Sequence, residues 1–142
     1  MNNPFAELVG FAPRIGRRGS GRCSAALELR PQLLNPNGVA HGGVLFALAD
    51  TAMGAALHTT LARGEFCATV EIKIHFLQPV LKGRVRCSAR VVQRGGRIAV
   101  LEAQLKAGRK LVAQALGTFA IFAPRTPPGT HTRDTKRARL SK

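Results

Sequence analysis

The sequence predicts an α+β domain in which one antiparallel sheet wraps around one long central helix. Residues 44–58 form an apolar run dominated by Ala and Leu, which favours a buried helix. Residues 67–77 alternate apolar and polar side chains, as a strand with one covered face does. Three further stretches of strand length follow, separated by glycine turns. One sheet around one helix accounts for this order.

The first third of the chain predicts one strand and two turns. Residues 16–21 are rich in glycine, and we interpret them as a loop or hairpin turn. They do not match a phosphate-binding loop, because no apolar strand precedes them and no helical run in register follows. Residues 22–30 alternate like a strand, which Pro31 ends. Residues 35–38, Asn-Pro-Asn-Gly, are a dense turn signal before the helix.

The helix at 44–58 is apolar nearly all round, so we expect it to be buried on every side. In the next strand, alternation places Ala68, Val70, Ile72, Ile74 and Phe76 on one face and Thr69, Glu71, Lys73 and His75 on the other.

Residues 84–94, 97–107 and 110–122 follow as three antiparallel strands, with hairpin turns at Gly95-Gly96 and at Gly108. We therefore assign residues 1–123 to one domain. Residues 124–142 contain Pro, Thr and basic residues with few apolar ones, which predicts a disordered basic tail.

The net positive charge of the chain indicates which classes of partner it can attract. The chain has 22 Lys and Arg against 7 Asp and Glu, and residues 1–123 alone carry 16 basic and 6 acidic residues. Such a surface attracts polyanions, either nucleic acid or a phosphorylated small molecule, although solubility alone accounts for most of these charges. Seven Phe with no Trp or Tyr argue against a stacking platform for single-stranded nucleic acid.

The three cysteines, Cys23, Cys67 and Cys87, form no CxxC pair, and no metal-ligand spacing is present. An odd number of cysteines and the lack of a secretory pattern fit a reducing compartment. The longest apolar run is short for a bilayer and contains Asp50. We expect a cytoplasmic protein with no membrane partner.

Asp50 is the first candidate for a catalytic residue. A carboxylate in an apolar helix costs free energy unless it is paired or used, so Asp50 is either a base or nucleophile or a structural residue that bonds nearby backbone. Gly42 and Gly43 precede it, where the first helical N–H groups are unpaired and can hold an oxyanion. A plain loop-to-helix junction would look similar. The glycine pair and Asp50 together favour a site.

The spacing of these groups predicts a site shared between subunits. Gly43 and Asp50 are about two helical turns apart, roughly 10 Å along the axis. One reacting carbon cannot easily contact both within one subunit. If both act on it, they come from two chains whose helices run antiparallel at a two-fold axis.

The segment from Asn35 to Ala52 resembles the signature of hotdog-fold thioesterases of the phenylacetate-pathway (PaaI-like) type. Its spacing is N-x5-H-G-G-x6-D, formed by Asn35, His41, Gly42, Gly43 and Asp50. The resemblance extends over residues 20–122 and includes the strand 69–74, Gln78-Pro79 and the turn Gly95-Gly96-Arg97. It implies a hotdog domain at 1–123, acyl-CoA as substrate, no metal or other cofactor, and a homodimer or dimer-of-dimers tetramer with shared active sites.

The resemblance also implies a role for each matching position. Asp50 matches the carboxylate that attacks the thioester or activates water, and Gly42 matches the backbone N–H that polarises the carbonyl. Asn35 and His41 match residues that orient the thioester or its leaving group. Thr69 matches a hydroxyl that holds the water in some members.

We assign substrate binding to Gly43, Gly96 and Arg97, with Arg97 near the CoA phosphates, although a solvated turn is the ordinary alternative at 95–97. Another branch of the family uses a Glu with a Thr one turn later. The later position is Gly54 here, so that arrangement is absent.

These observations predict hydrolysis of an aryl- or medium-chain acyl-CoA to free acid and CoA, with Asp50 as base or nucleophile and a backbone oxyanion hole. The main alternative is a non-catalytic acyl-CoA-binding or regulatory hotdog protein, which could dispense with Asp50. A hydratase or dehydratase would need a His/Asp or His/Glu pair that we do not find. A nucleic-acid-binding protein fits the charge but leaves Asp50 in its apolar helix unexplained.

Overall fold

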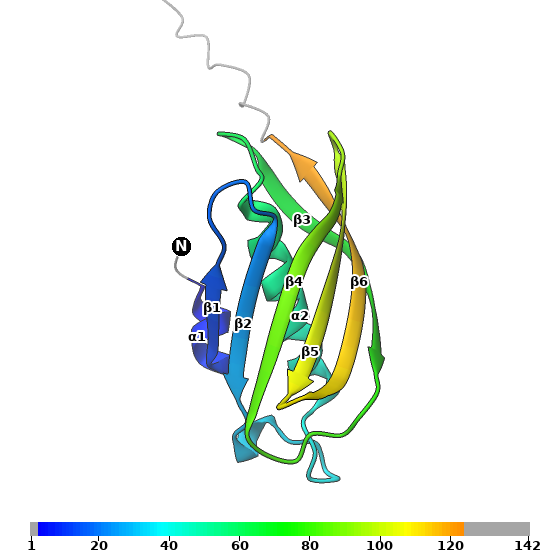
Figure 1. Cartoon of the computed structure of the whole chain (residues 1–142). Coiled ribbons are helices and arrows are strands. Elements are labelled where there is room, and N and C mark those ends of the chain that lie inside the picture. The colour runs from blue at the N-terminus through cyan, green and yellow to red at the C-terminus, as the bar shows by residue number, and fades with distance from the viewer. Residues whose placement is uncertain (1–2, 124–142) are drawn as a thin grey trace, which may run out of the picture.

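Helix α2 (Gly42–His58) lies in the hollow of a curved antiparallel sheet (Figure 1). This computed structural model describes residues 3–123, so the predicted tail at 124–142 lies outside the described residues. The six strands are β1 (Phe11–Ile15), β2 (Arg22–Glu28), β3 (Phe66–Phe76), β4 (Arg84–Arg94), β5 (Ile98–Ala107) and β6 (Lys110–Phe122). Their order in the sheet is β1-β2-β4-β5-β6-β3, which makes β1 and β3 the edge strands. The predicted sheet around a central helix is confirmed.

One face of α2 supplies much of the core. Seven of its residues are buried against the sheet: Leu45, Leu48, Ala49, Ala52, Met53, Ala56 and Leu57. The described residues leave the opposite face largely uncovered, since Asp50 and Gly54 are only half-buried and Phe46 keeps 37% of its surface exposed. The expectation that α2 is buried on every side is wrong for a single chain, because the chain's own sheet covers the helix from one side only. Neither helix within residues 3–123 is long and apolar enough to cross a membrane.

Two short elements and a 3-10 turn before α2 were not predicted. They are α1 (Pro4–Val9), β1 and the 3-10 helix η1 (Pro31–Leu33). Each is too short to show a hydrophobic period, and β1 has a single buried residue, Phe11. Pro13 is tolerated within β1 because β1 is an edge strand. Residues 16–21 join β1 to β2, which confirms the hairpin turn.

A β-bulge changes the face on which the first half of β3 lies. The register between β3 and β6 shifts between Thr69 and Glu71, which leaves Val70 as the additional residue and 59% exposed. Thr69 therefore points toward α2, on the same side as Ile72. The predicted alternation is wrong before the bulge, because it counted through Val70 without interruption and placed Thr69 on the outer face.

The last three strands follow the prediction closely. β4 and β6 have the expected bounds, and β5 begins one residue later than expected, at Ile98. Gly108, in the turn between β5 and β6, has a φ of +60°, which favours glycine. Alternate residues of these strands face α2, and Cys87, Leu101 and Leu105 are completely buried.

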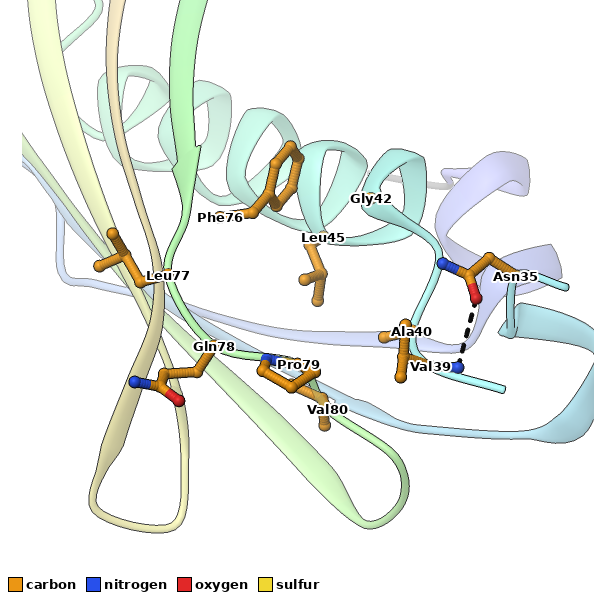
Figure 2. Close-up of a pocket in the computed structure, with 10 residues that line it drawn as sticks. All are labelled: Asn35, Val39, Ala40, Gly42, Leu45, Phe76, Leu77, Gln78, Pro79 and Val80. Atoms are coloured by element: carbon orange, nitrogen blue, oxygen red, sulfur yellow. Dashed lines mark hydrogen bonds between the residues drawn. The ribbon is translucent and has the colours of Figure 1, made fainter. Parts of the chain in front are cut away.

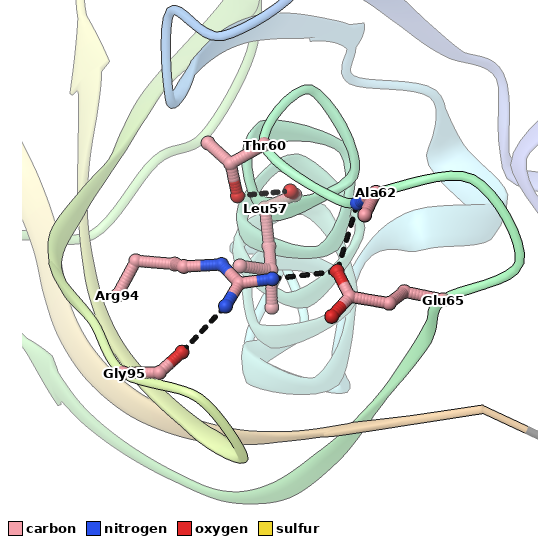
Figure 3. Close-up of polar contacts among 6 residues, drawn as sticks. All are labelled: Leu57, Thr60, Ala62, Glu65, Arg94 and Gly95. Carbon is pink, nitrogen blue, oxygen red and sulfur yellow. Dashed lines mark hydrogen bonds and ion pairs between the residues drawn. The ribbon is translucent and has the colours of Figure 1, made fainter.

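Polar contacts fix the C-terminal end of α2 to two loops. The Thr59 hydroxyl is buried, donates to the Ala56 carbonyl at 2.8 Å and accepts from the Gly21 N–H at 2.8 Å. At the same end, Arg94 forms an ion pair of 2.6 Å with Glu65 (Figure 3). The Glu65 carboxylate also accepts from the Ala62 N–H at 2.8 Å. The turn at 16–21 and the loop at 60–65 are thereby held against the helix end.

We expect Thr59→Val to lower the free energy of unfolding by about 1–3 kcal/mol, because it leaves the buried Gly21 N–H without an acceptor. Urea denaturation measures this loss. Thr60→Val is the matched control, since Thr60 bonds only the Leu57 carbonyl and should cost about 1 kcal/mol or less. Equal stability of both variants would show that the Gly21 contact contributes nothing.

Candidate active site

The first turn of α2 leaves one backbone N–H free. The His41 Nδ1 atom accepts from the Gly43 N–H at 2.9 Å, and the His41 carbonyl accepts from the Val44 N–H at 2.9 Å. Among residues 3–123, no acceptor binds the N–H of Gly42. Gly42 therefore presents the unpaired donor at the positive end of the helix dipole, where a developing negative charge is favoured.

A cleft of about 350 Å³ lies beside Gly42 (Figure 2). Its walls come from the loop before α2, the first turns of α2 and the segment that follows β3. The lining residues are Asn35, Val39, Ala40, Gly42, Leu45, Phe76, Leu77, Gln78, Pro79 and Val80. Most of these side chains are apolar, and Asn35 and Gln78 supply polar groups. The cleft can therefore hold a largely apolar ligand that also carries a few hydrogen-bonding groups.

The amide oxygen of Asn35 bonds to the loop, and its nitrogen is available to the cleft. Its Oδ1 accepts from the N–H groups of Asn37 at 2.9 Å and Val39 at 3.3 Å. Its NH₂ group has no partner within residues 3–123 and points toward the start of α2 (Figure 2). Asn35 thus shapes the turn with its oxygen and offers a donor to a ligand with its nitrogen.

Close packing explains both glycines at the start of α2. A Cβ atom on residue 42 would lie 3.1 Å from the Phe76 ring, so glycine allows that ring to cover the first turn. A Cβ atom on residue 43 would lie 3.0 Å from His41 Nδ1 and would displace the capping imidazole. The Gly43 N–H is already bonded to His41, so the substrate contact assigned to Gly43 stays a prediction.

Asp50 lies halfway along the uncovered face of α2. Its Oδ1 atom accepts from the Thr69 hydroxyl at 2.7 Å. Among the described residues, no donor binds its second carboxylate oxygen. The carboxylate is therefore held by one oxygen and presents the other to a ligand or to water. The β-bulge at Val70 makes this contact possible, because it turns Thr69 toward the helix.

Cys67 lies two residues before Thr69 and is half-buried. Burial and the negative charge of Asp50 raise the pKa of the Cys67 thiol, so this thiol is protonated at neutral pH and is a poor nucleophile. Burial also raises the pKa of Cys23 and, with a smaller effect of Cys23, that of Cys87 to about 12. Within residues 3–123, no three His, Cys, Asp or Glu side chains converge on a possible metal site.

One chain does not bring all predicted site residues together. Asn35 and Gly42 meet at the cleft, and His41 caps the helix next to them without lining it. Asp50 is eight residues from Gly42, about 12 Å along α2. The Arg97 carbonyl accepts from Ile121, and Phe76 pairs with Ala113 on the same strand β6. Those two positions on β6 are about 26 Å apart, so Gly96 and Arg97 lie at the other end of the sheet.

Sequence reasoning missed part of the cleft wall. Phe76, Leu77 and Val80 line the cleft, whereas the sequence motif includes only Gln78-Pro79 between them. An available signal was the apolar pair Phe76-Leu77 at the point where the alternation of β3 stops before Pro79. The spacing of the cysteines gives no sign that Cys67 lies near Asp50, because this proximity depends on the bulge.

Comparison with known proteins points to one family. A sequence model of the thioesterase superfamily matches residues 37–113. A Pseudomonas aeruginosa protein whose name proposes esterase activity is 32% identical over 122 residues, covering 84% of this chain and 90% of that protein. A solved structure of a conserved protein from the same organism has a TM-score of 0.80 and 40% identity, covering 86% of this chain and 96% of that chain. The PaaI protein of the E. coli phenylacetic acid degradation operon has a TM-score of 0.78 and 26% identity, covering 86% of each chain.

We expect His41→Ala to lower the free energy of unfolding by about 0.5–2 kcal/mol, because it removes the cap on the Gly43 N–H. His41→Asn should recover most of that stability, since Asn is a favourable capping residue. Urea denaturation of the two variants beside wild type measures both values. If the Asn variant is as unstable as the Ala variant, capping is not the reason for the loss.

Proposed function

Because this chain belongs to the thioesterase superfamily and is a thioester hydrolase of the hotdog fold, we propose that it hydrolyses an aryl- or medium-chain acyl-CoA to free acid and CoA. The observation that carries the proposal is the Asp50 carboxylate, which Thr69 holds at 2.7 Å through one oxygen while the other stays available. The free Gly42 N–H beside an apolar cleft supplies the second requirement of thioester hydrolysis, a donor for the oxyanion.

In the proposed reaction, the thioester oxygen accepts from the Gly42 N–H, and the Asn35 NH₂ group donates to the same thioester. Both contacts polarise the carbonyl carbon, and the helix dipole favours the negative charge of the tetrahedral intermediate. Asp50 either removes a proton from the attacking water or attacks the carbon itself, giving an anhydride that water then opens. A C–O bond forms, the C–S bond breaks, and the CoA thiolate leaves and takes up a proton.

We further propose that the site is completed by a second copy of the chain. Gly42 and Asp50 are too far apart to act on one carbon, and both lie on a helix with an uncovered face. A two-fold axis near Phe46 and Ala47 would set Gly42 of one antiparallel helix opposite Asp50 of the other. β3 is an edge strand, so a second β3 can extend the sheet in the same assembly. The unit is a homodimer, alone or within a dimer-of-dimers tetramer.

The same arrangement gives Gly96 and Arg97 a role. They lie at the sheet end opposite the cleft of their own chain, which an antiparallel dimer brings beside the cleft of the other subunit. Arg97 is exposed in the turn between β4 and β5 and can there contact the CoA phosphates. All three cysteines are free, which supports our placement of the protein in the cytoplasm.

A non-catalytic acyl-CoA-binding protein would also use the cleft and the Gly42 donor. A binding protein would not need a carboxylate that is held through one oxygen while the other oxygen stays available. The Asp50–Thr69 pair therefore favours hydrolysis. A hydratase or dehydratase is less well supported, because no imidazole is hydrogen-bonded to Asp50 or to any Glu within residues 3–123.

We expect Asp50→Asn to lower thiol release from a panel of aryl- and fatty-acyl-CoAs by at least about 100-fold, because it removes the base or nucleophile and keeps the shape. Glu71→Gln is the matched control, since Glu71 is an exposed carboxylate on β3 beyond the bulge, and its activity should equal that of wild type. Circular dichroism confirms that each variant is folded. Full activity of Asp50→Asn would leave Asp50 a structural role and would favour the binding protein.

Subunit mixing tests the shared site. Gly42→Pro removes the proposed donor at a helix position where proline is tolerated, and Gly42→Ala keeps that donor while adding a Cβ atom. We expect Gly42→Pro and Asp50→Asn to be inactive alone. Unfolded and refolded together, they should regain about a quarter of wild-type activity, because half of the dimers are mixed and each holds one intact site. No recovery, with mixed dimers confirmed by mass, would place the whole site within one chain.

A further inference from the structure

Gly54 is the one glycine inside a helix or strand of residues 3–123 for which the chain's own packing gives no reason. A Cβ atom on Gly42, Gly43 or Gly117 would come within 3.1 Å of a neighbouring atom. A Cβ atom on Gly54 would lie 3.8 Å from its nearest neighbour, Phe119 Cε1, which is ordinary contact. Its φ is not positive either. Glycine in the middle of a helix lowers stability relative to alanine, so the reason for Gly54 lies outside the packing of a single chain.

Gly54 lies next to the proposed reacting carboxylate. It is four residues after Asp50, about 6 Å further along α2 and on the same uncovered face. Along β3, Phe76 lies beside Gly42 and Thr69 beside Asp50, so the next position in this direction is Cys67. Cys67 is two residues from Thr69, about 6.6 Å along the strand, and lies on the Gly54 side of Asp50. The influence of Asp50 on the pKa of the Cys67 thiol agrees with this placement.

The group nearest to Gly54 on the sheet side is apolar. Phe119 pairs with Thr69 across the sheet and turns its ring edge toward Gly54. Cys67, with a protonated thiol, is the next residue of β3 on the helix-facing side beyond Thr69. Amide groups placed against these side chains would lose hydrogen bonds to water without replacement, whereas a hydrocarbon or aryl group has none to lose. The amide-bearing arm of CoA is better placed in the cleft, which offers Asn35 and Gln78. The space beside Gly54 suits the acyl group.

We propose that Gly54 sets the size of the acyl group that the enzyme accepts, because its missing side chain leaves room beside Asp50 for a bulky acyl group. A side chain at this position would fill that room and restrict the enzyme to short acyl groups. The inference rests on the proposed function, since it takes Asp50 as the reacting carboxylate. A different role for Gly54 would be to let a second α2 approach closely. That role would affect every substrate equally, whereas a size limit affects bulky substrates alone.

Non-hydrolysable thioether analogues of acyl-CoA test this proposal without requiring turnover. One analogue carries a two-carbon group and the other a phenyl-bearing group, and calorimetry gives their dissociation constants. We expect Gly54→Val to weaken the phenyl analogue at least about tenfold while changing the two-carbon analogue by less than about threefold. Cys67→Leu, which adds volume from β3, should give the same pattern. His58→Val introduces the same β-branched residue at an exposed position of α2 and should change neither constant.

Gly54→Ala separates the size limit from close helix approach. We expect it to melt at a higher temperature than wild type and to keep its oligomeric state by light scattering. Dissociation of the oligomer by Gly54→Ala, or an equal loss for both analogues in Gly54→Val, would overturn the proposal and assign Gly54 to subunit packing. Unchanged binding of both analogues, or binding of neither by wild type, would overturn it too. If wild type binds the analogues but releases no thiol from the acyl-CoA panel, the proposed hydrolysis is refuted. The dissociation constants of the phenyl and two-carbon analogues still decide the role of Gly54 in that case.

Discussion

The apolar surface of helix α2 is the constraint on which the rest of the structure depends. A helix that is apolar on both faces must be covered on both, and one chain supplies a single curved sheet. The buried face accounts for the wrapping of β2 to β6 around it. The uncovered face accounts for the proposed second subunit and for the position of Asp50, which would otherwise be a charge without purpose in an apolar helix. The apolar surface of α2 therefore underlies the fold, the proposed assembly and the proposed chemistry.

The functional groups are placed by the ends and the period of the same helix. Because a helix leaves its first N–H groups unpaired, its start is where a carbonyl oxygen can be bound, and His41 takes up the Gly43 N–H so that the Gly42 N–H remains. Because eight residues separate Gly42 from Asp50, the two groups cannot meet on one carbon within one chain. This separation along the helix is the reason that we propose a second subunit at the site.

The sheet supplies the hydroxyl group that holds the Asp50 carboxylate. Without the bulge at Val70, Thr69 would face away from α2 and Asp50 would have no hydroxyl partner. The extra residue also leaves the second half of β3 in its normal alternation, with Ile72 and Ile74 packed against the core. Bulges at edges and near active sites commonly re-aim one side chain in this way, and here the side chain holds the proposed catalytic group.

The sequence by itself determined the α+β class, the helix over residues 44–58, the last three strands and the motif from Asn35 to Asp50, because these depend on local periodicity and on residue types that are costly elsewhere. From the helix rise alone it also predicted that one carbon cannot easily contact both Gly43 and Asp50 within one subunit. Only the tertiary structure decided which N–H is free, how Asp50 is held, where the cleft lies and that no neighbour within the chain requires glycine at position 54. These features depend on a bulge, a cap and ring packing between segments far apart in the chain, which no local pattern encodes.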